Sequence, residues 1–381
     1  MTSPRTRTCT DSSDGSFTAS SFDGLEGYED GSTGRRCYTL RLLDASSGLS
    51  PSVTPTQPPS PDRTHRQPPG TPGRARRRRP HRTLAPWHPR VLGTWVAIGI
   101  GVLCARLPLW LLLQLGSLLG RVVWLVGGRR RRITEINLSL CFPDPEHTAV
   151  ERRRLGQSTF RHLGISIAET LVAWLGPGRP LDHRVTLEGF DELRAAARSG
   201  RGVLLVGAHF ACMEFIGGPL SRALALDVVY RRNRNPAWEW LQVRGRGRHF
   251  RNLIERDDTR GIVRALRNGH VVWYAPDQDY GPRNAVFAPF FGVPAATLTA
   301  TSRIATLTGA AVFFMAQHRD PGRRRWRVQV CPLPDFPTDA PEADARQLNL
   351  IIETAIREDP AQYLWLHRRF KTPPPGASSP Y

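Results

Sequence analysis

Hydrophobic positions change their pattern along the chain, and from about residue 183 short apolar runs alternate with longer amphipathic stretches. A short apolar run between turn residues is typical of a buried strand, and apolar positions at a spacing of three to four indicate a helix. The predicted strands cover residues 184–189, 202–208, 227–231, 270–276 and 310–318, and the predicted helices cover residues 191–200, 211–223, 236–250, 259–269 and 340–358. This alternation predicts an α/β fold with a mostly parallel central sheet flanked by helices.

A different pattern fills residues 91–126, which are apolar almost throughout. About 20 apolar residues suffice to cross the hydrocarbon core of a bilayer. Arg106 and Pro108 interrupt the run, and an arginine at the bilayer centre costs about 2.5–3.5 kcal/mol on insertion scales. We therefore expect one tilted, kinked membrane helix or a membrane-embedded helix pair, with a buried core helix as the alternative. Arg129 to Arg132 follow directly and would meet lipid phosphates.

Residues 1–90 show a third pattern, rich in Ser, Thr, Pro, Gly and Arg with little apolar periodicity. Such a composition cannot bury enough apolar surface to fold and predicts a disordered arm. The chain is thus expected to have three parts: a basic, Pro-rich arm over residues 1–90, a membrane-anchoring segment over residues 91–126, and an α/β domain over residues 127–381.

Charge narrows the class of partner. The 381 residues carry 53 Lys and Arg against 33 Asp and Glu, a formal net charge of +20, and Lys371 is the only lysine. Such an excess favours polyanionic partners: nucleic acid, acidic lipid headgroups or an acidic carrier protein. The six cysteines are scattered without a Cys-x-x-Cys pair, so neither a disulfide framework nor a zinc site is predicted.

Candidate chemistry begins at "LLVGAHFACMEF", residues 204–215, where His209 follows the end of a predicted strand and Glu214 lies in the next helix. On one regular helix a spacing of five leaves two side chains roughly 140° apart, so they meet only if His209 precedes the helix. Histidine is suited to proton transfer near neutral pH, and a carboxylate on its far nitrogen fixes the tautomer. The alternatives are a structural histidine and a thiol nucleophile at Cys212.

Further polar residues accompany these. Asp277 and Asp279, in "APDQDYGPR", follow the strand over residues 270–276 and so lie at a carboxyl edge of the sheet. We expect them to brace the site or to bind a site arginine. Arginines also gather around one predicted helix, where they would bind phosphates or form a solvated basic face; they are Arg231, Arg244, Arg246 and Arg248. Residues 364–371, "LWLHRRFK", would lie at a membrane surface or cap the fold with their aromatic side chains buried.

Several of these segments carry a resemblance. "GAHFACMEF" resembles the histidine–acid box of the lysophospholipid acyltransferase superfamily. Residues 230–248, 261–297 and 359–376 are similar to the lipid A biosynthesis acyltransferases of the lauroyl group, and the resemblance covers about residues 87–381. The chain departs from that group at Arg232, where proline is expected.

The resemblance implies transfer of a fatty acyl chain from acyl carrier protein to a hydroxyl of a 3-hydroxyacyl chain on the Kdo-modified lipid A precursor. It implies His209 as general base and Glu214 as its orienting partner, with Arg246 and Asp277 as the other important positions. Arg246, or the backbone N–H groups at the start of the following helix, would stabilise the oxyanion, and Arg231 and Asp279 complete the candidate substrate-binding residues. No metal or cofactor is implied. We expect an inner-membrane protein in contact with anionic phospholipid, with its catalytic domain on the cytoplasmic side.

Two other functions compete. A glycerophospholipid acyltransferase usually carries a proline-glycine-threonine-arginine-like block, which is not found here. An arginine-rich nucleic-acid-binding protein would interleave basic residues with exposed aromatics on a recognised module. Here the arginines instead flank an apolar segment and a strand end that carries candidate catalytic residues, so no nucleic-acid partner is expected.

Overall fold

The computed structural model describes residues 26–30, 35–39, 88–178, 181–320 and 322–381. The chain divides into two units, residues 1–78 and 79–381. In the first unit, β1 (Glu26–Asp30) pairs antiparallel with β2 (Arg35–Thr39), a strand pair that the composition of this arm did not predict. The rest of the arm that was predicted to be disordered lies outside the described residues, apart from its last positions.

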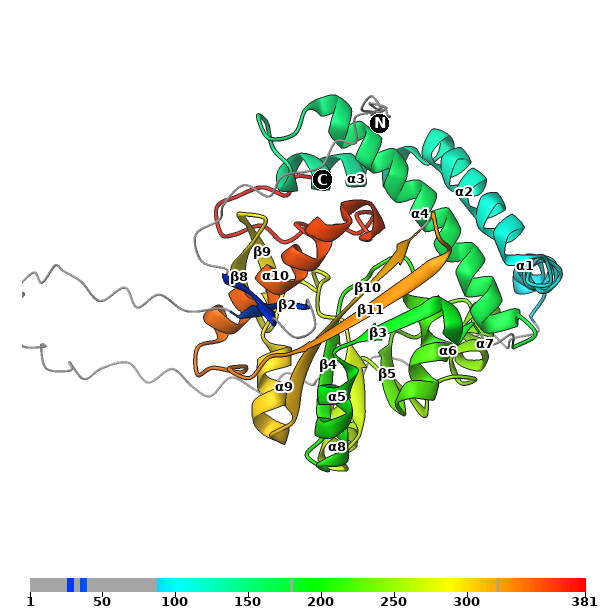
Figure 1. Ribbon diagram of the computed structural model, residues 1–381. Coiled ribbons are helices and arrows are strands. Elements are labelled where there is room, and N and C mark those ends of the chain that lie inside the picture. The colour runs from blue at the N-terminus through cyan, green and yellow to red at the C-terminus, as the bar shows by residue number, and fades with distance from the viewer. Residues whose placement is uncertain (1–25, 31–34, 40–87, 179–180, 321) are drawn as a thin grey trace, which may run out of the picture. The chain divides into compact units, whose positions relative to one another are not determined.

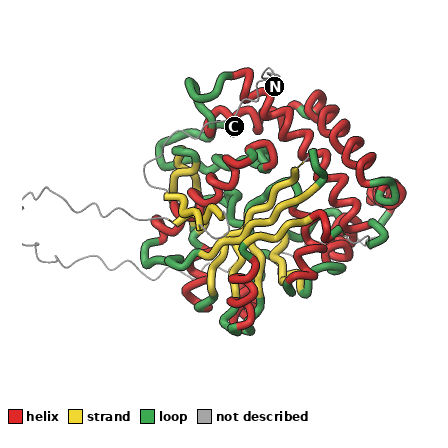
Figure 2. Tube along the Cα trace, viewed as in Figure 1, coloured by secondary structure: helices red, strands yellow, loops and turns green. Residues whose placement is uncertain are grey.

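The second unit is built on a seven-stranded sheet of order β3-β11-β10-β4-β7-β5-β6 (Figures 1 and 2). Its strands are β3 (Val185–Glu188), β4 (Val203–Gly207), β5 (Leu226–Tyr230), β6 (Asn252–Glu255), β7 (Val271–Tyr274), β10 (Ala311–Asp320) and β11 (Arg325–Pro332). Every pairing in this sheet is parallel except β10 with β11. The predicted mostly parallel α/β sheet is therefore confirmed.

Helices cover both faces of this sheet, so its central strands are apolar throughout. In β4, Leu204 and Val206 face one hydrophobic core, and Val203 and Leu205 face the other. The first core is closed by α3 (Gly128–Cys141), α8 (Thr259–Arg267), α9 (Ala300–Thr308) and α10 (Pro341–Glu358). The second is closed by α5 (Phe190–Arg198) and α6 (Met213–Ala223), with contributions from α2 (Leu109–Val126) and α4 (Ala149–Leu175). Burying each such aliphatic side chain contributes about 1.5–3 kcal/mol, which makes β4 a rigid support for the loop at its carboxyl end.

Smaller elements complete the unit. They are α7 (Pro236–Arg246), the antiparallel pair β8 (Ala285–Phe290) and β9 (Val293–Leu298), and the short helices η1 (Pro89–Val91), η2 (Asp182–Arg184) and η3 (Pro360–Gln362). Each predicted strand and helix is present, with ends shifted by a few residues. The structure adds β6, β8, β9, β11, α3, α4 and α9 to the predicted elements.

The apolar segment forms two helices, α1 (Leu92–Cys104) and α2 (Leu109–Val126), with Pro108 directly before the second. The segment is therefore a pair of helices, as one of the predicted alternatives held. Figure 1 shows α2 running along α4 (Ala149–Leu175). Their backbones approach closely because a Cβ at Gly116 would lie 2.6 Å from the carbonyl oxygen of Gly164, and one at Gly120 would clash with that of Phe160. Glycines thus set the spacing between α2 and α4.

α4 is in turn attached to the sheet by a buried ion pair. Arg319 of β10 donates from Nε and Nη2 to the two carboxylate oxygens of Glu169, at 2.6 and 2.5 Å. Trp326 of β11 donates to the same carboxylate at 2.7 Å, and Arg319 also contacts His162 Nδ1 at 2.8 Å. The exposed fraction is 0% for Glu169 and 3% for Arg319. Each charge is therefore compensated by the other, and α4 is fixed in position over the sheet.

The C-terminal segment differs from one sequence expectation. Trp365 and Phe370 are buried in the core that α3 and α10 close, and Asn137 of α3 donates to the backbone carbonyls of Trp365 and His367. Residues 364–371 therefore cap the fold. The alternative, in which they lie on a membrane surface, is wrong because their aromatic side chains are needed in the core.

Candidate active site

The loop after β4 carries His209 and is held on two sides. At the end of the strand, a Cβ at Gly207 would lie 2.6 Å from the indole nitrogen of Trp273, so only glycine lets that ring pass. Beyond it, the N–H of Ala211 donates to the carbonyl of Gln362 at 2.8 Å, and the N–H of Leu364 donates to the carbonyl of His209 at 3.0 Å. The backbone of His209 is thus fixed by the C-terminal segment before any side chain is considered.

A single carboxylate orients the ring of His209. Oδ1 of Asp277 lies 2.6 Å from Nδ1 of the ring, and Oδ2 accepts the backbone N–H of His209 at 3.0 Å. β4 and β7 are parallel neighbours, so their carboxyl ends bring the two residues together at one edge of the sheet. The Asp277 side chain is 1% exposed, whereas that of His209 is 24% exposed. With Nδ1 donating to Asp277, Nε2 is left as the basic nitrogen.

The prediction that Glu214 orients His209 through the far ring nitrogen is wrong, because Asp277 holds that nitrogen. Glu214 lies in the first turn of α6. Its Oε2 accepts from the indole N–H of Trp174, at the end of α4, at 3.0 Å, and from Nε of Arg246 at 3.2 Å. Nη2 of Arg246 donates to the other oxygen. These two partners turn the carboxylate toward α4 and α7.

Arg246 and Glu214 therefore form an ion pair in the wall of the site. Their side chains are 14% and 15% exposed, and the guanidinium also lies 5.8 Å from the centroid of the Trp174 ring. Gly245 allows this stacking because a Cβ there would clash with the ring of Trp174. Two of the donors on Arg246 are thus engaged by Glu214, and the indole shields the pair on one side.

Two spaces meet at Glu214. A cavity of about 200 Å³ is lined by His209 and Glu214 together with residues of α4 and of the C-terminal segment, namely Thr159, Leu163, Ser166, Ala361, Gln362, Tyr363, Leu364 and Leu366. A narrower space of about 30 Å³ lies between α6 and the sheet, bounded by Glu214 and Arg246 and otherwise mainly apolar, with Leu220, Leu226, Val228 and Met315 in its lining. The basic ring therefore borders a cavity that adjoins an apolar slot.

The charged groups around His209 shift its pKa. Burial acts to lower the pKa of His209, but the charge and hydrogen bond of Asp277 outweigh it and raise the pKa above the ordinary histidine value. Burial acts to raise the pKa of Asp277, and His209 reverses this through its charge and its two hydrogen bonds, so that pKa is lowered. The aspartate thus stays ionised and stabilises the imidazolium.

Cys212 does not support the thiol alternative. The residue is completely buried in the core between α6 and the sheet, and burial raises the pKa of its thiol far above the ordinary value. A thiol that is both neutral and inaccessible cannot act as a nucleophile.

The remaining predicted residues have other partners. Asp279 is buried and accepts the backbone N–H and the hydroxyl of Thr372, at 2.8 and 2.9 Å, so it braces the C-terminal segment instead of facing the cavity. Arg231 is exposed at the end of β5. Arg244 is also exposed and lies over the Trp240 ring, whereas Arg248 donates to two backbone carbonyls at the end of α4. The structure therefore brings together His209, Asp277, Glu214 and Arg246 and leaves Arg231 and Asp279 outside this group.

Sequence reasoning missed Trp174 and the segment Gln362–Leu364 as parts of the site. Trp174 binds Glu214, and the hydroxyl of Tyr363 donates to the backbone carbonyl of Asp277 at 3.5 Å. No local motif marks either one, since each reaches the site only through the crossing of distant segments. Over the described ranges, no group of three or more His, Cys, Asp or Glu side chains is arranged to hold a metal ion.

Asp277 and His209 pair at the carboxyl edge of the sheet, and His209 lines a cavity beside an apolar slot, an arrangement suited to general-base activation of an alcohol. The chain belongs to the bacterial lipid A biosynthesis acyltransferase family, whose profile matches residues 79–372. The chain is therefore an acyltransferase.

Individual relatives agree. The chain is 40% identical over 296 residues to the lipid A biosynthesis palmitoleoyltransferase of Escherichia coli K12, covering 77% of this chain and 96% of that protein. It is 39% identical over 297 residues to the lauroyltransferase of the same strain, covering 77% and 96%. Identity to the myristoyltransferase of that strain is 30% over 309 residues, covering 77% and 91%. These relatives favour lipid A assembly over the glycerophospholipid and nucleic-acid alternatives.

Proposed function

We propose that this protein transfers a fatty acyl chain, lauroyl in the first instance, from acyl carrier protein to a hydroxyl of a 3-hydroxyacyl chain on Kdo-modified lipid IVA. The observation that carries this proposal is the ring of His209, held by Asp277 at Nδ1 and bordering the cavity. Family membership supports the acceptor class. The names of the relatives support a fatty acyl donor, although they differ in chain length.

In the proposed mechanism, His209 first accepts the proton of the acceptor hydroxyl and later gives it to the leaving group. Nε2 accepts the proton of the acceptor hydroxyl while the hydroxyl oxygen bonds to the thioester carbon, and Asp277 stabilises the imidazolium that forms. Collapse of the tetrahedral intermediate breaks the carbon–sulfur bond. The leaving thiolate then takes the proton from Nε2, which restores the neutral ring. No acyl-enzyme is needed, because a thioester is already an activated acyl group.

The oxyanion of that intermediate needs donors that are already in place. The first-turn N–H groups of α6, which begins four residues after His209, supply positive potential at the edge where the carbonyl lies. Arg246 is held in its ion pair with Glu214, which offsets its charge at this edge. The Glu214–Arg246 pair thus acts as a polar wall between the cavity beside His209 and the apolar slot.

We place the helix pair α1–α2 in one face of a membrane, lying in its plane. Among the described helices, α2 is long and apolar enough to span a bilayer, and its outer face exposes Trp110, Leu115, Leu118, Leu119, Val122, Leu125 and Val126. Its inner face, however, packs on α4, where Arg161 lies 3.5 Å from Ser117 at the middle of α2. Arg121 also lies in the helix and is exposed. A spanning helix would put these arginines in hydrocarbon, which is costly, whereas an in-plane helix keeps them at the headgroups.

The reaction is tested with the purified full-length protein, acyl carrier protein loaded with chains of several lengths, and the lipid A precursor, with products identified by mass spectrometry. We expect the acceptor to gain one acyl chain, and His209→Ala to abolish this. The matched control is His270→Ala, because His270 pairs with buried Asp227 at 2.7 Å at the opposite edge of the sheet. Near wild-type turnover by His209→Ala, or equal loss in both variants, would refute the role of the base.

Membrane placement is tested by labelling Arg106→Cys and Arg129→Cys, two exposed positions that flank α2. An in-plane helix exposes both thiols to an impermeant maleimide from the cytoplasmic side alone, as measured by peptide mapping on inside-out and right-side-out vesicles. Labelling of the two positions from opposite sides would show that α2 crosses the bilayer.

A further inference from the structure

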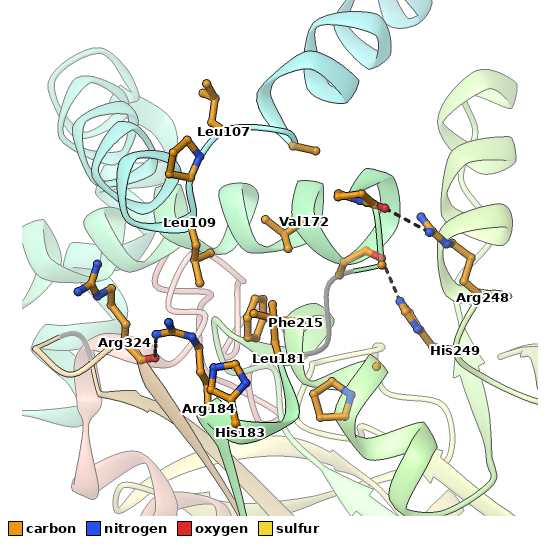
Figure 3. A pocket seen from close by; sticks show the side chains of 18 of the residues that line it. Leu107, Leu109, Val172, Leu181, His183, Arg184, Phe215, Arg248, His249 and Arg324 are labelled. Carbon is orange, nitrogen blue, oxygen red and sulfur yellow. Dashed lines mark hydrogen bonds between the residues drawn. The ribbon is translucent and has the colours of Figure 1, made fainter.

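A second sizeable cavity lies away from His209, between the linker of α1 and α2 and the far side of α6. Its volume is about 410 Å³, within the range that suits small-molecule ligands. It is lined by the linker residues Ala105, Leu107 and Pro108, by Leu109 and Trp110 at the start of α2, by the end of α4, by one side of α6, and by residues around η2 and the β10–β11 turn. Figure 3 shows its labelled side chains converging from these regions.

The lining is cationic and contains no carboxylate. Four arginines and two histidines contribute to it, namely Arg184, Arg222, Arg248, Arg324, His183 and His249, and none of the other lining residues is Asp or Glu. The protein contains 33 acidic residues, yet none of those that the structure describes lines this cavity. Such a cavity concentrates anions.

Some of these cations already have partners and some do not. Arg248 and His249 donate to the carbonyls of Trp174 and Ala173 at the end of α4 (Figure 3). Arg222 pairs with Asp182, with both side chains about half exposed. Among the described residues, Arg184 makes a single 3.5 Å contact, to the backbone carbonyl of Arg324.

Within the described residues, no carboxylate lies in salt-bridge range of Arg184 or Arg324. Arg184 reaches the backbone carbonyl of Arg324, and both side chains border the cavity, so each guanidinium group is available to an anion there. The guanidinium group is the side chain best suited to phosphate, because it donates two parallel hydrogen bonds.

The opposite wall is apolar and continues toward α1 and α2. Leu107 of the linker, Leu109 at the start of α2, Val172 of α4, Leu181 and Phe215 line this wall (Figure 3). The linker joins α1 to α2, and the outer faces of both helices are exposed and apolar. A ligand that fits both walls carries phosphate at one end and hydrocarbon at the other.

We propose that this cavity binds a phosphate-bearing lipid, with the phosphate between Arg184 and Arg324 and the hydrocarbon against Leu107, Leu109 and Phe215. Two lipids share this chemistry: the phosphorylated acceptor of the reaction, which rests on the proposed function, and an anionic phospholipid of the bilayer. In either case the lipid is held beside α6, the helix that carries Glu214 on its other side.

The test uses the double variant R184Q/R324Q in the full-length protein. The control is Arg323→Gln, which removes one positive charge from the turn that carries Arg324, but at a side chain that is 81% exposed and pairs with Asp320. The first arm measures binding of the acceptor, with and without its phosphates, to an inactive His209→Ala background, so it does not depend on turnover. The second arm measures co-sedimentation with phosphatidylglycerol-containing and with purely zwitterionic vesicles.

Losing two phosphate contacts is expected to weaken the affected binding by about tenfold or more, since each charged hydrogen bond contributes strongly. Loss confined to the phosphorylated acceptor identifies the acceptor as the ligand, and loss confined to phosphatidylglycerol vesicles identifies the bilayer lipid. Loss in both arms shows that either lipid uses the cavity. Unchanged binding in both arms overturns the proposal, as does an equal loss in Arg323→Gln. When R184Q/R324Q is assayed for turnover with His209 intact, a rise in KM for the acyl donor alone also overturns the proposal, because the phosphate would then be that of the carrier.

Discussion

Replacing Asp277 with asparagine tests the orientation of His209 most directly. The aspartate accepts two hydrogen bonds, one from the ring Nδ1–H and one from the backbone N–H of His209. Asparagine keeps the shape but offers only one acceptor oxygen toward these two donors. Either its amide group faces the backbone N–H, or it faces the ring and forces the proton onto Nε2.

The expected loss of kcat in Asp277→Asn depends on which of these two arrangements the asparagine adopts. The first leaves a buried donor unmatched, which costs about 1–3 kcal/mol, and both arrangements remove the negative charge that stabilises the imidazolium. The second produces a ring that cannot accept a proton at Nε2. We expect kcat to fall by roughly 10³–10⁴, as in the equivalent change in a serine protease triad, which corresponds to about 4–5.5 kcal/mol.

The pH profile provides a second readout. His209 acts as a base only when neutral, so kcat/KM rises with pH through its pKa, which Asp277 holds above the ordinary value. In Asp277→Asn the charge is gone and the lowering by burial remains. The acid limb of the profile should therefore move to lower pH while the plateau falls.

The assay is initial-rate kinetics with acyl carrier protein as donor across the pH range, with thermal unfolding as the check on folding. A folded variant that stays within about tenfold of wild type, a drop far below that of the triad comparison, would refute the orienting role of Asp277. An acid limb that moves to higher pH would refute it too.

Three further changes probe the supporting structure. Gly120→Leu should separate α2 from α4 and lower the melting temperature in detergent, whereas Gly99→Leu, a position with open space around it, should not. Cys212→Ala should keep kcat within about threefold of wild type, and Cys212 in the folded protein should resist maleimide; inactivation would restore the thiol mechanism. Glu169→Gln leaves Arg319 buried without its counter-charge, so urea unfolding should show a loss of about 3–5 kcal/mol; a loss below about 1 kcal/mol, typical of exposed pairs, would contradict the stabilising role of this pair.

Local patterns predicted the central strands because buried parallel strands are continuous apolar runs, as in β4. Two missed elements had usable signals. The start of α4 carries Thr148 and Glu151 at the spacing of a capping box, which the structure forms, and β11 alternates exposed with buried positions. β6 is only four residues long and half exposed, so it has too little pattern to detect.

The site was partly predictable for a related reason. The position of His209 depends on the strand just before it, which is local information. Its partner depends on β4 lying next to β7, although three helices and two strands separate them in the chain. A spacing rule therefore favoured Glu214, the nearest acid in sequence, while strand order selects Asp277.

α4 serves as the common wall of two otherwise separate regions. On one side Phe160 and Gly164 carry the apolar helix α2, and on the other Thr159, Leu163 and Ser166 border the reaction cavity. In the proposed membrane placement, α4 therefore sets the height of His209 above the lipid, and a shift of α2 by one helical turn would move it by about 5.4 Å. The lipid acceptor would then have to reach His209 at one fixed depth.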